Sequence, residues 1–168
     1  MSRPLARISA AACLSLTALP AAHAGVVSAP GAFSFTAPPG WVVKPFPGMK
    51  YNACYAKPVG GFAPNVNVVD EAASVPLARY ARANLTLLQS RYPGFHSLGQ
   101  SSFTTRSGVH GVKLLATASP AGRKIRQAFY LFAGRGAQKW VVTASTPAAE
   151  GGKYDRILDA SMKTFALK

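Results

Sequence analysis

The chain has 168 residues, of which 49% are hydrophobic and 14% charged, so it is long enough for one globular domain that needs no disulfide to fold. Its 19 Lys and Arg residues oppose 5 Asp and Glu residues, and the net charge of +14 favours partners with negatively charged surfaces. Beyond the N-terminal segment, no stretch approaches the roughly 18 consecutive apolar residues of a membrane-spanning helix.

The N-terminal segment has the three parts of a secretory signal peptide. Arg3 and Arg7 supply the positive start, an apolar run follows, and a small-x-small pattern ends at Ala24. We expect residues 1–24 to be a signal peptide cleaved near Ala24, and residues 25–168 to form a single domain that is periplasmic or secreted. Cleavage removes two cations and lowers the net charge from +14 to +12.

Two cysteines are too few for a disulfide framework. Cys13 lies in the leader and lacks the leucine expected three positions before a lipidated cysteine, which favours ordinary export. Cys54 is then the one thiol of the mature chain, in an oxidising compartment. We expect it to be a small buried hydrophobe; a reactive thiol and an intermolecular disulfide are the alternatives.

The mature chain reads first as a series of strands. Residues 25–31 are expected to be a mobile leader. Runs of aromatic and β-branched residues, separated by Pro and Gly, then predict strands. The turn residues Pro38-Pro39-Gly40 predict that the first two strands form a hairpin. The expected strands are Phe33–Ala37, Trp41–Val43, Lys50–Lys57, Asn65–Asp70, Ser97–Thr105 and Val109–Ser119.

Two segments have apolar residues at helical spacing. The first is Ser74 to Tyr92, with Ser74 as its cap and Pro-Gly after its end. The second follows Gly151-Gly152 and is expected to keep Asp155 and Asp159 on its solvated face, paired with basic residues of the same helix. A short closing strand is expected within residues 164–167. The expected buried side of the second helix is Tyr154, Ile157, Leu158, Ser161 or Met162, and Phe165.

The most apolar stretch runs from Arg123 to Thr146. Two aromatic and β-branched runs, joined by a connection with Gly134 and Gly136, predict a β-hairpin. Its strands are apolar on both sides, so both faces of the sheet must be covered. The predicted fold class is therefore α+β, an α-β-α sandwich with a central antiparallel sheet flanked by helices.

The order of elements resembles the PsbP/DcrB-like superfamily. The resemblance spans residues 33–167 and rests on several short motifs in sequence. It implies an α-β-α sandwich around an antiparallel sheet and mostly non-catalytic members, including photosystem subunits and bacterial envelope proteins. The motifs are Phe33-x-Phe35, Pro38-x-Gly40-Trp41, Asn65-Val-Asn-Val-Val69, Gly108-x-x-Gly111, Val141-Val-Thr-Ala144 and Lys163-Thr-Phe165.

No residues match a catalytic or metal-binding pattern. There is no Gly-x-Ser-x-Gly elbow, and His96 and His110 stand outside any His or Cys cluster of metal spacing. We expect no catalytic residues, no metal and no cofactor. A small enzyme that uses His110 or Cys54 is kept as a further alternative.

Basic residues near the predicted hairpin are the candidate binding residues. Residues 123–126 lie at one end of the hairpin and Arg135 and Lys139 at the other, so they cannot form one compact patch. Arg106 and Lys113 are expected to extend the first group or the adjacent strand. The candidates are Arg106, Lys113, Arg123, Lys124, Arg126, Arg135 and Lys139.

These observations favour a non-enzymatic, exported binding or interaction module of the bacterial cell envelope. The alternative is a basic binder of polyanions or membrane surfaces, such as lipopolysaccharide or anionic lipid. The expected partner is an envelope protein or an anionic envelope component, with peripheral membrane contact as an option. An exported protein rarely meets nucleic acid, and no recognition motif for it is present. The sequence leaves the oligomeric state open.

Overall fold

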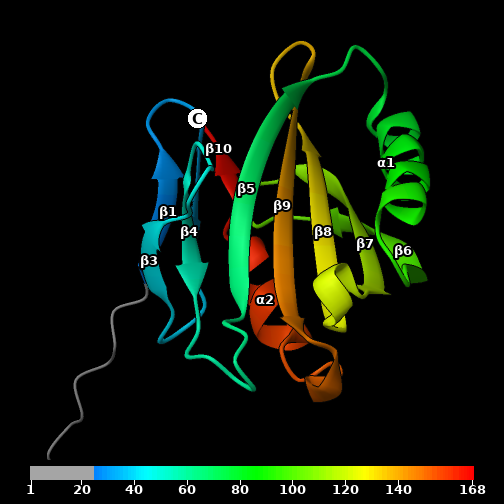
Figure 1. Ribbon diagram of the computed structural model, residues 1–168. Coiled ribbons are helices and arrows are strands. Elements are labelled where there is room, and N and C mark those ends of the chain that lie inside the picture. Colours follow the sequence, from blue (N-terminus) through cyan, green and yellow to red (C-terminus); the bar gives the residue numbers. More distant parts are fainter. Residues whose placement is uncertain (1–24) are drawn as a thin grey trace, which may run out of the picture.

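The computed structural model describes residues 25–168, so the expected signal peptide lies outside the described residues. The described chain forms a seven-stranded sheet of order β3-β4-β5-β9-β8-β7-β6 and a three-stranded sheet of order β1-β2-β10, both antiparallel (Figure 1). The elements are β1 (Val26–Ala29), β2 (Phe33–Thr36), β3 (Val42–Pro45), β4 (Asn52–Tyr55), β5 (Asn65–Ala72), α1 (Leu77–Arg91), β6 (His96–Thr104), β7 (His110–Ala118), β8 (Ile125–Ala133), β9 (Gln138–Pro147), α2 (Asp155–Met162) and β10 (Ala166–Leu167).

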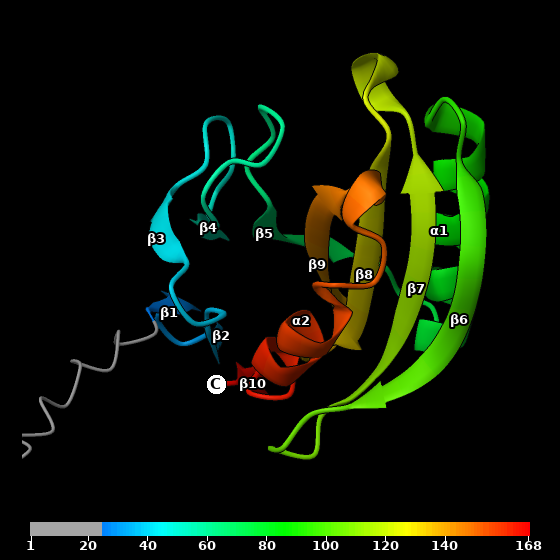
Figure 2. The same cartoon turned by 90° about the horizontal axis from the view of Figure 1, so that it is seen from below.

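The large sheet curves around α2 and the small sheet, and α1 lies on its outer face (Figure 2). Alternate residues of β8 serve the two sides, as expected for the period of two along a strand. Tyr130 and Phe132 join the larger core on the inner face, whereas Phe129 and Leu131 pack beneath α1. The larger core also contains Val27, Phe33, Phe35, Trp41, Cys54, Val66, Val68, Trp140, Val142, Leu158, Met162 and Phe165.

The α+β class and the central antiparallel sheet are confirmed, but helices cover less of the sheet than predicted. The eight residues of α2 span only about 12 Å, while seven strands spaced about 4.8 Å apart are more than twice as wide. The small sheet therefore completes the inner cover. On the outer face, α1 contacts β7 and β8, so the cover there is also partial.

The hairpin predicted between Arg123 and Thr146 is confirmed as β8 and β9. Phe132 lies directly opposite Trp140, and Tyr130 opposite Val142, so the inner face carries large apolar side chains on both strands. Both strands are interior strands of the sheet and both of their faces are covered, which explains why most of their residues are buried. The outer face of β9 nevertheless carries Lys139, Thr143 and Ser145 beside Val141.

Two expectations about the first of the described residues are wrong. Residues 25–31 are not a mobile leader, because β1 pairs with β2 and Val27 is fully buried. The strands on either side of Pro38-Pro39-Gly40 do not pair with each other. β2 pairs with β1 and β10, whereas β3 pairs with β4 in the large sheet. Turn residues predict where the chain bends, but they do not specify the sheet that each arm joins.

The first helix begins later than predicted. Its N-cap is Pro76, and no side chain caps it, so the expected role of Ser74 is wrong. The residues that it buries most are Tyr80 and Ala81, which pack on β7, β8 and β9. The second helix buries Leu158, Ser161 and Met162 as expected, and the closing strand is confirmed as β10.

Candidate functional site

The sheet places the β6–β7 turn and the β8–β9 turn at the same end. This follows from the register, because Gly111 near the start of β7 lies opposite Phe132 near the end of β8. We call this end of the strands, together with the β5–α1 connection, the turn end; its β8–β9 turn and the β5–α1 connection lie at the top of Figure 1. Arg106 and Arg135 are exposed in its two turns, and no ion pair of the described residues involves either. Arg106 therefore lies at the same end of the strands as Arg135 and does not extend the group of residues 123–126, which was one of the two places expected for it.

The basic residues at the opposite end are largely used to hold the structure together. The Arg123 guanidinium donates to the Gly60 carbonyl oxygen at 3.0 Å and lies over the Phe62 ring. Arg126 forms an ion pair with Asp155, with Nη2 and Oδ2 2.6 Å apart. Lys124 is exposed. This end therefore offers fewer uncommitted cations than the sequence suggested.

Lys113 is also neutralised within the protein. From the inner face of β7, its Nζ contacts Asp159 of α2 at 2.7 Å and 2.9 Å, and the Tyr130 hydroxyl donates to the same carboxylate at 2.7 Å. The expectation that Asp155 and Asp159 pair with cations of their own helix is wrong. Their helix packs against the inner face of the sheet, where Lys113 and Arg126 are the nearer cations. The sequence signal for these ion pairs was the position of Lys113 and Arg126, single cations within otherwise apolar strands.

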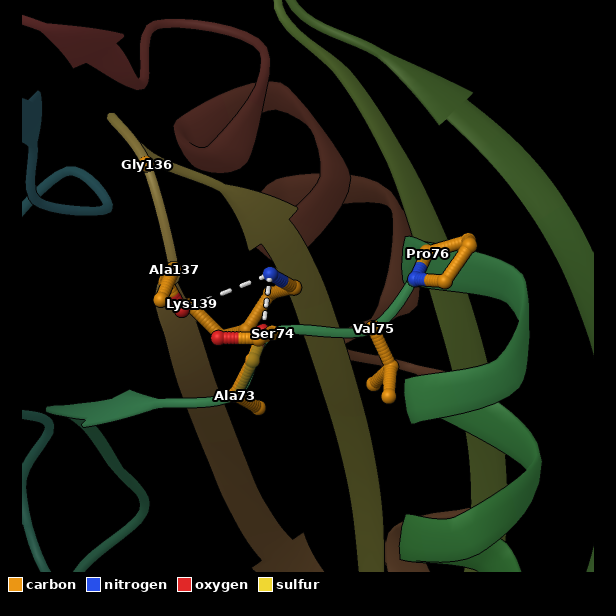
Figure 3. Close-up of a pocket in the computed structure, with 7 residues that line it drawn as sticks. All are labelled: Ala73, Ser74, Val75, Pro76, Gly136, Ala137 and Lys139. Carbon is orange, nitrogen blue, oxygen red and sulfur yellow. Dashed lines mark hydrogen bonds between the residues drawn. The ribbon is translucent and has the colours of Figure 1, made fainter.

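Lys139 is buried at the turn end, where it has carbonyl partners and no carboxylate partner among the described residues (Figure 3). Its Nζ donates to the Ala73 carbonyl oxygen at 2.7 Å and to that of Ala137 at 3.4 Å. An ammonium has three N–H donors, so one remains for another acceptor. Glu71 lies opposite Lys139 across the strands, but its carboxylate accepts a hydrogen bond from the Tyr80 hydroxyl instead.

The same side chain lines a hollow of about 300 Å³ between the β5–α1 connection and the β8–β9 turn. Ser74, Val75 and Pro76 form the side of this hollow that leads into α1. The first turn of α1 contains no acidic residue, so its N-terminal N–H groups add a positive potential near the hollow. The hollow therefore favours a ligand with an anionic oxygen, such as a phosphate or carboxylate.

Two further hollows lie beside the first at the turn end. One, of about 520 Å³, is lined by Lys50, Asp70 and Gln138; the other, of about 250 Å³, is lined by Arg135, Gln138 and Lys168. Burial opposes ionisation of Asp70, but hydrogen bonds from Tyr51 and Lys50 outweigh it and lower the pKa of this carboxyl. Asp70 therefore stays charged and neutralises Lys50. Of the cations that line these two hollows, Arg135 and Lys168 remain able to bind a ligand.

The residues considered for catalysis remain apart. His110 is exposed, with its Nδ1 3.2 Å from the Thr104 hydroxyl, and His96 is exposed elsewhere on the sheet edge. Neither His110 nor Cys54 lines any of the hollows described above. Within residues 25–168, no three His, Cys, Asp or Glu residues cluster as a metal site would require. No helix of the described chain is long and apolar enough to cross a membrane.

Cys54 is fully buried in the larger core, as expected for a small hydrophobe. Burial raises the pKa of its thiol to about 12. We expect the native thiol to resist iodoacetamide at mildly alkaline pH and to react at once in denaturant, measured by mass spectrometry. Because burial raises the pKa of the Cys54 thiol in the folded state, the thiol contributes its full stabilisation below the unfolded-state pKa of about 8.5. That contribution to the free energy of unfolding is lost as the pH rises through the pKa of the folded state. Rapid alkylation of the native chain would contradict this.

The sequence did not indicate Lys50, Asp70 or Gln138 as residues of the site. They come from two strands and a loop whose proximity only the sheet order creates. The sequence did contain one signal, the adjacent acidic residues Asp70 and Glu71 near the end of β5. Because the whole chain has only 5 acidic residues, two neighbouring carboxylates could have been expected to have cationic or hydrogen-bonding partners.

The fold has solved relatives, although the sequence matches no protein-family model and no curated protein. PA94 from Pseudomonas aeruginosa, a protein of unknown function, superposes with a TM-score of 0.61 at 16% identity, covering 84% of this chain and 95% of its own. LpqN of Mycobacterium tuberculosis, involved in cell envelope biogenesis, gives 0.62 at 16% identity, covering 83% and 86%. Cyanobacterial PsbP (CyanoP) from Synechocystis sp. PCC 6803 gives 0.59 at 11% identity, covering 96% and 99%. The chain therefore has the PsbP-like fold, as its motifs suggested.

Proposed function

We propose that this protein is a non-enzymatic, exported binding module of the bacterial cell envelope, and that it holds an anionic envelope component at the turn end. The observation that carries the proposal is Lys139, a buried ammonium with only carbonyl partners beside a hollow of about 300 Å³. Arg106 and Arg135 add exposed positive charge at the same end. Similarity to LpqN, a protein involved in cell envelope biogenesis, supports the envelope assignment.

Binding without chemistry fits the residues better than an enzyme does. A nucleophile needs a base within hydrogen-bond reach, but Cys54 is buried in the apolar core, and His110 contacts only a threonine hydroxyl. By contrast, the turn end combines cations, a hollow and an uncapped helix start. Such an arrangement attracts phosphate or carboxylate oxygens without activating them.

Binding to vesicles tests the site. Phosphatidylglycerol-containing vesicles should retain the protein at low salt and release it at high salt, because exposed charges are screened. Arg135→Glu should weaken this binding roughly tenfold or more, since one cation near an anionic surface contributes about 1 kcal/mol and reversal also adds repulsion. Co-sedimentation measures the affinity.

Arg91→Glu is the matched control, because it makes the same charge change at the far end of α1, a helix about 22 Å long. It should bind almost as wild type does. Equal losses in the two variants would mean that net charge, not the turn end, attracts the ligand. Binding that does not depend on the salt concentration would also contradict the proposal.

Export is tested separately. Mass spectrometry of the secreted chain should find Gly25 as its first residue.

A further inference from the structure

β6 is a long edge strand of the large sheet, and its outer edge lacks the features that usually prevent pairing with another strand. β6 has nine residues, and seven of them are exposed. It contains no Lys, Asp, Glu or Pro, the residues that proteins commonly place on edges to prevent pairing. The other edge of the large sheet, β3, is four residues long and contains both Lys44 and Pro45. A single irregularity between Ser97 and Gly99 interrupts the pairing of β6 with β7.

The register shows which backbone groups of β6 point outward. The Thr105 N–H donates to the Val109 carbonyl oxygen at 3.0 Å, which makes that pair hydrogen-bonded. Antiparallel ladders alternate, so Gln100, Ser102 and Thr104 turn their N–H and C=O groups away from β7. Lys163 confirms this direction, since its Nζ reaches the Thr104 carbonyl oxygen from outside the ladder at 2.5 Å. The outward groups of Gln100 and Ser102 have no such cover.

A hollow lies beside this edge on the inner face. It has a volume of about 220 Å³ and is lined in part by Leu98, Leu115 and the stem of Lys113. Leu98 is 43% exposed, a large value for an aliphatic side chain. A strand added next to β6 would place every second side chain on this face. An aliphatic side chain of that strand could then cover Leu98.

The charge near the edge selects the kind of strand. Exposed Arg106 and partly exposed Lys163 lie at the Thr104 end, and the described residues carry a net charge of +12. A second copy carries the same net charge of +12, so repulsion between the two copies opposes their pairing at low salt. A segment with an acidic residue would be attracted instead.

We propose that β6 binds an extended peptide segment of another protein by strand addition, with an aliphatic side chain of the peptide in the hollow beside Leu98 and an acidic residue near Arg106. Backbone hydrogen bonds to Gln100 and Ser102 hold the peptide, and the hollow and the cations select its sequence. The hollow beside Leu98 and the hollow at Lys139 share no lining residue, although Arg106 is expected to contribute charge to both surfaces. Ser102→Pro tests the edge and Arg135→Glu tests the turn end, so the two proposals can fail independently.

The test uses a displayed library of short random peptides, panned against the protein purified after export. Enriched peptides should have apolar residues at alternating positions and at least one Asp or Glu. A synthetic version of an enriched peptide should bind the wild type and Ser102→Ala with equal affinity. It should bind Ser102→Pro roughly tenfold more weakly, because proline removes one outward N–H donor and its ring obstructs hydrogen bonding between β6 and the peptide. Titration calorimetry measures the affinities.

Folding controls separate a blocked edge from a damaged sheet. Proline is tolerated where the N–H of an edge strand faces solvent, so Ser102→Pro should melt within about 3 °C of the wild type. Ser101→Pro removes a bond to β7 and should lower the melting temperature by roughly 5 °C or more. Failure to enrich peptides, or enrichment that Ser102→Pro leaves unchanged, overturns the proposal. So does a dimer that Ser102→Pro dissociates, which would assign the edge to a second copy.

Discussion

Phe165→Ala is expected to lower the free energy of unfolding by about 4 kcal/mol, the largest single effect that we expect in this protein. Phe165 is fully buried and packs against three aromatic rings from two strands, those of Phe33 and Phe35 in β2 and that of Phe132 in β8. Its ring centroid lies 4.4 Å from that of Phe132 and 5.8 Å from that of Phe33. Truncation removes these contacts and leaves a cavity where the large sheet, the small sheet and the end of α2 meet. Urea denaturation should show a lower midpoint with an unchanged m-value.

Phe165→Leu and Phe46→Ala are the matched controls. The leucine variant keeps most of the buried volume and should lose roughly 1 to 2 kcal/mol. Phe46 stacks on Tyr55 at the edge of the protein and is only partly buried, so its truncation should cost about 1 kcal/mol. Equal losses at Phe165 and Phe46 would show that the aromatic cluster does not hold the two sheets together.

Local patterns predicted most of the elements but not how they combine. The hairpin of β8 and β9 was predictable because both strands are rich in aromatic and β-branched residues and the turn between them contains glycines. Pairing between distant segments was not, since a strand such as β2 carries no mark of its partner. Its partners β1 and β10 lie in the first and last parts of the described chain. A PsbP-like order of motifs was the clearest sequence signal for this arrangement.

The candidate site was predictable only in part. The sequence identified Arg135 and Lys139 as cations near one end of the hairpin, and both lie at the turn end. It could not show that Lys139 is buried, because its nearest acceptors are backbone carbonyls, which every residue has. It also could not separate Lys113 and Arg126 from the exposed cations. Their neutralisation depends on how α2 is rotated against the sheet.

Asp159→Ala is expected to lower the free energy of unfolding by about 3 kcal/mol, although the carboxylate is 37% exposed. The reason lies in its two partners. The Lys113 side chain is only 13% exposed, and Tyr130 is fully buried, so both would keep a donor without an acceptor. Burial, and then the hydrogen bond to Asp159, raise the pKa of Tyr130, so its hydroxyl keeps the proton that it donates. The melting temperature of Asp159→Ala should be roughly 6 to 12 °C below that of the wild type.

A double-mutant cycle with Lys113→Met decides whether this loss comes from the unpaired ammonium. If it does, Lys113→Met combined with Asp159→Ala should be more stable than Asp159→Ala alone, because methionine replaces the buried charge with an apolar chain of similar length. Lys153→Met is the control, since that ion pair with Glu150 is exposed on the lysine side and should contribute little. Additive losses at Lys113 and Asp159 would show that the pair does not fasten α2 to the sheet. The inner core would then hold α2 in place through Leu158 and Met162 alone.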